Sequence, residues 1–378
     1  MNNIVNDILA SSVSLRHELH RNAELSSHET VTKRLLMKYL SKNTSLELHD
    51  MGSWFYAAYR CGVGRNIAFR ADFDALPIGE GQALEYASKN PGVSHKCGHD
   101  GHSACLCAFA QLIDRTGCKN NVFFLFQHAE ETGCGAYECQ RLIELEHIDE
   151  IYGFHNMPGL PFGSVAVHTG TAACASKGLV LSFAGVTSHA SQPERGRNPA
   201  FAISKLICDI PESIKPDKYS GMVLCTVIRV DIGEEAFGTS AGRGRLMLTI
   251  RAEHESEMDS LEAHLTELAQ DYADADSLTL SIEYREPFPE TYNHEESAER
   301  VRKSCTELGI PIARWDEPFR SSEDFGVYTK RTKGALFYVG CGENYAPLHT
   351  EGYDFPDDMI KTVISLYGKL SENNYHFV

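Results

Sequence analysis

The segment His95 to His102, HKCGHDGH, places three histidines, one cysteine and one aspartate within eight residues. Cys97 and His99 are two positions apart, so on an extended or turning backbone a thiolate and an imidazole can point to one side and bind one metal ion. A catalytic metal takes three or more protein ligands and keeps a position open for water. Further carboxylates and histidines must therefore come from distant parts of the chain.

Candidates for these further ligands stand where predicted strands end. The runs at 66–71, 121–127 and 150–154 read as strands, and helical patterns separate them. Five acidic or imidazole side chains follow them: Asp72, Asp74, Glu130, Glu131 and His155. Functional groups of a parallel sheet gather at the carboxyl ends of its strands, so we expect these side chains to meet. His349, in PLHTEG, lies between short turns late in the chain and could close the site.

The adjacent Glu130 and Glu131 can take different roles at a metal site. In a loop after a strand, one carboxylate can bind metal while the other takes the proton of a water. A Glu-Glu pair by itself is usually a solvated surface pair, and only its position after an apolar strand favours a function. An alternative chemistry is a cysteine nucleophile, with Cys97 activated by His99 or His95.

The elements that must position these residues predict an α/β fold with two domains. Helices and strands alternate along residues 1–176, which predicts a largely parallel, mixed sheet flanked by helices. A buried helix is expected at Ser103–Ile113, directly after HKCGHDGH. Residues 177–287 change pattern and predict an inserted, smaller α+β domain with an antiparallel sheet and two helices. The first pattern resumes over 288–378, so we expect the flanks to form one domain.

Composition limits the partners and the compartment. The chain has 378 residues and a formal charge of −17, which argues against nucleic acid or an anionic membrane as a partner. Nowhere do about 18 consecutive apolar residues occur, the length that a membrane helix needs. The twelve cysteines follow no disulfide framework and are expected to be reduced. We therefore expect a cytoplasmic protein.

Seven motifs together resemble one family. In chain order they are RADFDALPI, HKCGHDGH, QHAEE, GFHNMP, GVTSHASQPE, SSEDF and LHTEG. Their order and spacing are similar to those of the dimetal amidohydrolases and metallopeptidases that include hippurate hydrolase, indole-acetyl-amino-acid hydrolase, aminoacylases and related carboxypeptidases. The resemblance spans nearly the whole chain and implies that 1–176 with 288–378 is a catalytic dimetal domain and 177–287 a lid or dimerisation domain.

The resemblance also implies the roles of individual residues. The positions that match the family's ligands for two divalent ions are Cys97, His99, Glu131, His155 and His349. Glu130 matches the general base, which would take a proton during attack by metal-bound hydroxide and pass it to the leaving amine. Thiolate, imidazole and carboxylate ligands suit zinc or manganese, and cobalt or nickel are alternatives. Four further side chains are expected to orient and tune the ligands: Asp72, Asp74, Asp100 and His102.

Two residues of the inserted domain match substrate-contacting positions of the family. His189, in SHAS, resembles the histidine that stabilises the oxyanion of the tetrahedral intermediate, often in the site of the partner subunit. Arg251 resembles an arginine near the substrate carboxylate, which a guanidinium can bind in bidentate fashion. By the same resemblance we expect a homodimer formed through the inserted domain.

The chain departs from the family pattern at four places. HRNAEL replaces the usual H-x-x-P-E-L, and His128 stands where proline is usual in the glutamate motif. In the inserted domain, Gly238 within AFGTSAG stands at about the position of a substrate-binding asparagine, and GRNP replaces I-D-P. No proposed ligand is lost. The last two departures leave the acyl and amino-acid specificity open.

We therefore expect a metal-dependent amidohydrolase that removes the acyl group from an N-acyl amino acid or a small peptide-like amide. Besides the cysteine nucleophile, a non-catalytic acyl-amino-acid-binding or peptide-binding protein on the same fold is the second alternative, because an altered substrate segment is how such drift would begin. The presence of all proposed ligands together with Glu130 argues against it.

Overall fold

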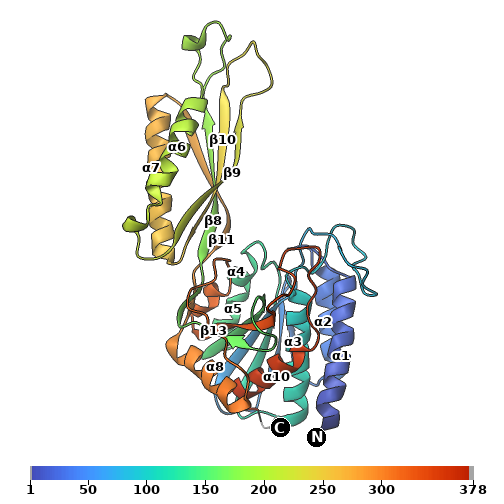
Figure 1. Ribbon diagram of the computed structural model, residues 1–378. Coiled ribbons are helices and arrows are strands. Elements are labelled where there is room, and N and C mark those ends of the chain that lie inside the picture. The colour runs from blue at the N-terminus through green and yellow to red at the C-terminus, as the bar shows by residue number, and fades with distance from the viewer. Residues whose placement is uncertain (1, 374–378) are drawn as a thin grey trace. The chain divides into compact units, whose positions relative to one another are not determined.

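The computed structural model describes residues 2–373, which form two compact units (Figure 1). The first unit comprises Met1–Ala172, Thr291–Pro318 and Asp324–Val378, and the second comprises Ala173–Glu290 with the short segment Phe319–Glu323. The sequence gives no sign that this last segment leaves the first unit.

A seven-stranded mixed sheet forms the centre of the first unit. Its strand order is β1-β2-β4-β3-β5-β13-β6. The strands are β1 (Glu47–Asp50), β2 (Phe55–Tyr59), β3 (Asn66–Asp72), β4 (Asn121–Gln127), β5 (Glu150–Pro158), β6 (Val165–Ala166) and β13 (Lys333–Gly342). The four central strands run parallel, and β1, β2 and β6 add antiparallel edges. The carboxyl ends of β3, β4 and β5 therefore meet at one edge, and the predicted fold class is confirmed.

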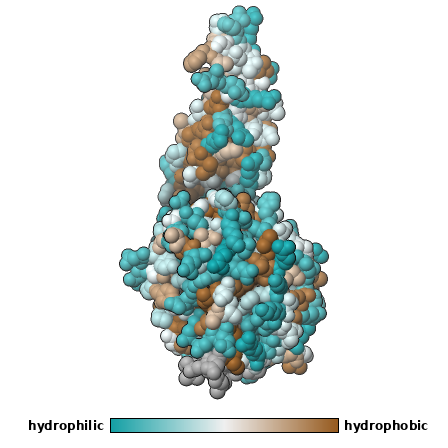
Figure 2. Space-filling model, turned by 90° about the vertical axis from the view of Figure 1, so that its right-hand side faces the viewer, coloured by the Kyte–Doolittle hydropathy of each residue, from teal (hydrophilic) through white to brown (hydrophobic). Residues whose placement is uncertain are grey.

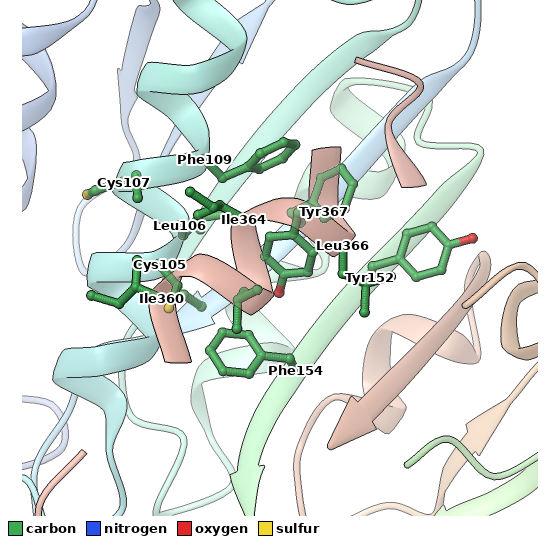
Figure 3. Close-up of a cluster of buried hydrophobic side chains, with 14 of the residues drawn as sticks. Cys105, Leu106, Cys107, Phe109, Tyr152, Phe154, Ile360, Ile364, Leu366 and Tyr367 are labelled. Carbon is green, nitrogen blue, oxygen red and sulfur yellow. The ribbon is translucent and has the colours of Figure 1, made fainter. Parts of the chain in front are cut away.

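Helices cover this sheet (Figure 1). The longer ones are α1 (Asn2–Arg21), α2 (Thr30–Asn43), α3 (His99–Thr116), α8 (Glu295–Leu308) and α10 (Met359–Leu370), and the short ones are α4 (Gly135–Cys139), α5 (Arg141–Leu145) and α9 (Gly326–Thr329). Figure 3 shows side chains of α3, α10 and β5 that pack together, with the ring of Tyr367 5.4 Å from that of Phe109 and 6.0 Å from that of Phe154. Every residue from His99 to Ile113 is buried, so α3 is enclosed on all sides and holds its first turn rigidly.

The apolar pattern predicts that this helix begins at Ser103. In the structure, helix α3 begins earlier, at His99. The first turn carries polar and glycine residues, which give no hydrophobic periodicity, so sequence reasoning places the start too late. Gly98 precedes the helix at φ +96°, and a Cβ there would lie 2.4 Å from Oδ1 of Asn156. Only glycine fits this turn, which brings Cys97 and His99 to the same edge of the sheet.

The second unit is an antiparallel four-stranded sheet in the order β11-β8-β10-β9. Its elements are β8 (Ala175–Ala184), α6 (Ala200–Ser213), β9 (Val223–Ile232), β10 (Arg243–Ala252), α7 (Glu255–Ala275) and β11 (Thr279–Phe288), with 3₁₀ turns at Pro193–Arg195 and Pro216–Lys218. Side chains of both helices pack into one hydrophobic core with the sheet. A separate two-stranded sheet pairs β7 (Gly170–Ala173) with β12 (Thr291–Asn293).

Hydrophobic side chains also lie on the surface of the second unit. The edge strand β9 exposes Val227, Ile228, Val230 and Ile232, and Figure 2, which shows the side that carries β9, has brown patches among polar residues on this unit. Within residues 2–373, the helices include none that combines the length and the apolar character of a membrane span.

Candidate metal centre

The structure brings the sequence-predicted ligands together at the carboxyl edge of the seven-stranded sheet. Asp72 ends β3, Asp74 follows it, and Glu130 with Glu131 lies in the loop after β4. His155 lies within β5, which continues three residues beyond it. Cys97 and His99 reach the edge from the start of α3, and His349 comes from the loop after β13. Five segments of the chain thus converge on one place.

Cys97 lies at the centre of the cluster. Its Sγ is 3.4 Å from Nε2 of His155 and 3.3 Å from Nε2 of His349. Two sets of three ligand atoms, each within 4.8 Å of one another, contain this sulfur: Cys97 with His99 and His155, and Cys97 with Glu131 and His349. Each set has the size and composition of a transition-metal site, and a thiolate common to both can bridge two ions.

Two buried atoms in the cluster carry the strongest sign of a cation site. Nε2 of His99 and Oε1 of Glu131 are buried and make no hydrogen bond with any described residue, although they lie 3.7 Å apart. Buried polar atoms nearly always have a partner, and leaving one without costs about 1–3 kcal/mol. Metal ions bound in the cluster would satisfy both atoms, so the residues present fit a metal.

The electrostatics of the cluster are those of ligands gathered around excess negative charge. Burial, and then the carboxylates of Glu131 and Glu130, raise the pKa of the Cys97 thiol well above its ordinary value. Burial also raises the pKa of Glu131 to about 7. Burial would lower the pKa of His99, but Asp72 and Asp74 outweigh it and raise that pKa to about 10. A divalent ion favours deprotonated thiol, carboxyl and imidazole and would reverse all three shifts.

Asp74 fixes the orientation of two proposed ligands. Its Oδ1 accepts a hydrogen bond from Nδ1 of His99 at 3.1 Å, which leaves Nε2 of that ring directed into the cluster. Its Oδ2 accepts bonds from the backbone N–H of Glu131 at 3.0 Å and from Oγ of Ser26 at 2.7 Å. A carboxylate bonded in this way sets the tautomer and direction of a ligating histidine.

Asp72 and His102 belong to a second chain of buried hydrogen bonds. Asp72 accepts from Arg70 at 2.6 Å and bonds Nδ1 of His102 at 2.6 Å, whereas its distance to Nδ1 of His99 is 3.8 Å. Nε2 of His102 bonds Oδ1 of Asn156 at 2.5 Å, and the amide of Asn156 donates to the carbonyl of Cys97 at 3.0 Å. These hydrogen bonds hold the backbone turn at Cys97 and do not bond its sulfur.

Asp100 does not bond to any of the five proposed ligands. Its carboxylate accepts from Arg16 at 3.2 Å and bonds Nδ1 of His20 at 2.8 Å, which ties helix α1 to the first turn of α3. The helical turn directs position 100 away from the side on which His99 lies, a direction that residue spacing in a presumed loop does not reveal.

Sequence reasoning missed three residues that shape the site. Asn156 follows His155 directly in GFHNMP, and an asparagine beside a proposed ligand was the available signal. Ser26 and Glu29 lie in HRNAELSSHET, between two predicted helices, and Glu29 accepts a hydrogen bond from the backbone N–H of Ala129 at 2.8 Å. No local pattern indicates this contact, because it joins positions 100 residues apart.

The two substrate-site candidates of the second unit are positioned by their neighbours. His189 is exposed; its Nδ1 accepts the backbone N–H of Ser191 at 3.1 Å and lies 2.7 Å from Oγ of that serine. Arg251, on β10, donates from Nη1 to the carbonyl of Arg320 and to Oγ of Ser322 at 2.5 Å.

The family model for peptidase family M20/M25/M40 matches residues 68–373, which include every proposed ligand and the whole second unit. The chain belongs to this family. It is therefore an amidohydrolase, as the motifs predict, and the family named from the resemblance is confirmed.

Curated relatives and solved structures cover nearly the whole chain. An N-acetyldiaminopimelate deacetylase from Shouchella clausii is 29% identical over 348 residues, covering 88% of this chain and 90% of the relative. A hippurate hydrolase from Campylobacter jejuni is 27% identical over 374 residues and covers 97% of both chains. A dinuclear metal-binding peptidase of family M20 from Bacillus subtilis has the same fold, with a TM-score of 0.82, 22% identity and coverage of 97% and 98%.

Proposed function

We propose that this protein hydrolyses the amide bond of N-acyl amino acids, or of small peptide-like amides, with two divalent metal ions and with Glu130 as general base. The observation that carries the proposal is the pair of three-ligand sets that share Cys97. One would hold an ion with His99 and His155, and the other with Glu131 and His349. The names of the two curated relatives, a deacetylase and a hippurate hydrolase, support an N-acyl substrate.

Glu130 has the position that a base needs. Its Oε2 lies 3.9 Å from Nε2 of His99, and its side chain is 7% exposed, so it faces the cluster from a nearly dry environment. When bound, the two ions would acidify a water and polarise the scissile carbonyl. Glu130 would accept the proton of the attacking water and return it to the leaving amine. Zinc or manganese suits the ligand set best, and cobalt or nickel would also fit.

His189 is proposed to stabilise the negative charge that develops on the carbonyl oxygen. Because its Nδ1 accepts the backbone N–H of Ser191, the neutral ring carries its proton on Nε2. An exposed Nε2–H donor is what an oxyanion requires. Arg251 is proposed to bind the substrate carboxylate, since both of its bonds leave from Nη1 and a bidentate carboxylate would take Nε and Nη2.

We further propose a homodimer formed through the second unit. The edge strand β9 carries unpaired backbone groups beside the exposed Ile228 and Val230, and an exposed apolar edge favours pairing with another chain. Ile228→Lys should shift the mass measured by light scattering towards a monomer, whereas Arg229→Lys, at the next position, should not. A monomeric wild-type protein would contradict this proposal. A cytoplasmic location stays a prediction.

The experiment that tests the function is a release assay. Free amine is measured with N-acetyl, N-benzoyl and longer N-acyl amino acids, for protein stripped of metal and reloaded with each of the four metals. We expect turnover only after reloading. Turnover that survives a chelator and is abolished by a thiol alkylator would favour Cys97 as nucleophile, although burial raises the pKa of this thiol and opposes that role. Tight binding without amine release would favour the binding-protein alternative.

A further inference from the structure

The loop between α1 and α2 contacts the metal centre as well as joining two helices. Leu25 pairs with Ala75 in a parallel bridge, next to Asp74. Ser26 donates to Oδ2 of Asp74, and Oε1 of Glu29 accepts the backbone N–H of Ala129. The loop thus touches both segments that lead into the site, the one after β3 and the one after β4.

Ala129 directly precedes the Glu130–Glu131 pair. It has φ +48°, a left-handed conformation that an alanine rarely adopts because its Cβ crowds the following carbonyl. Its carbonyl accepts the backbone N–H of Gly135 at 3.0 Å and of Cys134 at 3.3 Å, and Oγ1 of Thr132 at 3.3 Å. Its own N–H donates to Glu29 at 2.8 Å. A methyl side chain offers no polar anchor, so bonds to the Ala129 backbone hold the turn, and Glu29 provides the one at its N–H.

The side chain of Glu29 does not cap helix α2, although Glu29 occupies the N-cap position. Glu29 directly precedes α2, at a position whose side chain commonly caps the first N–H groups, yet it makes no such bond. Glu24 caps the helix instead, because its Oε2 accepts the backbone N–H of Val31 at 2.9 Å and of Thr32 at 2.8 Å. Glu29 is 6% exposed and directed towards Ala129, and a buried carboxylate is costly unless its hydrogen bonds matter.

We propose that Glu29 is a positioning residue for the reaction: its carboxylate holds Ala129 in the left-handed conformation and thereby aims Glu130 as base and Glu131 as ligand. The proposal rests on the function proposed above. Without the acceptor at position 29, the turn relaxes to negative φ, and both glutamates rotate away from the direction that they have here. The turnover number and the metal affinity of the Glu131 set then fall, while substrate binding by the second unit does not change.

The test compares substitutions at Glu29 and Glu24, two carboxylates of the same loop. Glu29→Leu removes the acceptor, Glu29→Asp shortens its reach, and Glu29→Gln keeps an amide oxygen at the same place. Glu24→Leu is the matched control, because it removes the cap of α2 and leaves Ala129 untouched. With metal loaded, we expect kcat of Glu29→Leu and Glu29→Asp to fall about 10–100-fold, the range found for residues that support metal ligands, with KM nearly unchanged. Glu29→Gln should stay within about threefold of wild type.

Two further readouts do not depend on activity. Calorimetric metal titration should show weaker binding of one of two ions in Glu29→Leu, and amide hydrogen exchange at positions 129–131 should quicken. Glu24→Leu should lower Tm but change neither. The proposal is overturned if Glu29→Leu and Glu29→Asp keep wild-type kcat and metal affinity, or if Glu24→Leu loses as much kcat. Normal turnover of Glu130→Gln would instead refute Glu130 as the base. The metal titration and hydrogen exchange would still test whether Glu29 positions the Ala129 turn.

Discussion

The carboxyl edge of the seven-stranded sheet and the surface of the antiparallel unit hold their candidate side chains in different ways. At the sheet edge, His99 is buried and bonded to Asp74, which in turn bonds the backbone of Glu131 and the hydroxyl of Ser26. In the antiparallel unit, His189 is exposed and fixed only by Ser191, two residues away. His99 is thus held by a buried hydrogen-bond network, whereas the proposed ligand His349 and the proposed oxyanion donor His189 are exposed. The Gly238 departure from the family pattern falls in the second region.

Removing metal should have the largest effect on activity and tests the role of the sheet edge most directly. Dialysis against a chelator should abolish amine release, and adding zinc or manganese should restore it, because the proposed reaction needs bound ions to acidify the water and polarise the carbonyl. Elemental analysis of Cys97→Ala should show loss of both ions, since this sulfur belongs to both sets. Full metal occupancy in Cys97→Ala would refute the bridging assignment.

Glu130→Gln should separate base from ligand within the adjacent pair. We expect kcat to fall by about 10²–10⁴-fold, because an amide cannot accept the proton, while metal content stays at the wild-type level. Glu131→Gln is the matched variant and should lose metal. The two glutamates have the same role if both variants lose metal equally.

His189→Ala tests the exposed region. The loss of one oxyanion donor should lower kcat by about 10²–10³-fold without changing metal content. Tm should not change, because the ring is exposed and, within residues 2–373, hydrogen-bonds only to Ser191. His264→Ala, an exposed histidine on α7 of the same unit, should have wild-type kinetics. Equal kinetics for the two variants would remove His189 from the reaction.

Arg251→Lys should raise KM about tenfold with little change in kcat, since a lysine cannot bind a carboxylate in bidentate fashion. The measurement is steady-state kinetics with an N-acyl amino acid and with the corresponding amino-acid amide, which lacks the carboxylate. Wild type and variant should differ for the acid and agree for the amide. A similar change for both compounds would assign Arg251 a structural role, through its bonds to Arg320 and Ser322.

The smallest expected effect is on stability, and it tests the buried hydrogen bonds of His20. Burial would lower the pKa of His20, but hydrogen bonds to Asp100 and Glu80 outweigh it and raise that pKa to about 9 from an ordinary 6.5. The protonated ring therefore stabilises the fold below pH 6.5, and this contribution is lost as pH rises through 9. The Tm difference between wild type and His20→Gln should shrink over that range, whereas the exposed His28→Gln should show a small, constant difference.

How much of the molecule follows from sequence depends on the range of the interaction involved. The strands β3, β4 and β5 and the residues that follow them are predicted because apolar runs and turn residues are local signals. β1, the polar ELHD, and the first turn of α3 are missed because neither has a hydrophobic pattern. The direction of Asp100 towards Arg16 and His20, and the bond of Glu29 to Ala129, could not be predicted because they join distant segments.

By itself, the sequence determined the set of chemical groups: a thiol, imidazoles and carboxylates at the ends of strands that must lie in parallel. Tertiary structure decided which of them share a site and how each is aimed. Cys97 became common to two ligand sets because Gly98 permits a turn with positive φ against Asn156. The pair Glu130–Glu131 follows a turn at Ala129, whose positive φ is held in part by Glu29, the residue before α2. The spacing of residues fixes which groups are available, but their orientation depends on hydrogen bonds that only the folded chain can form.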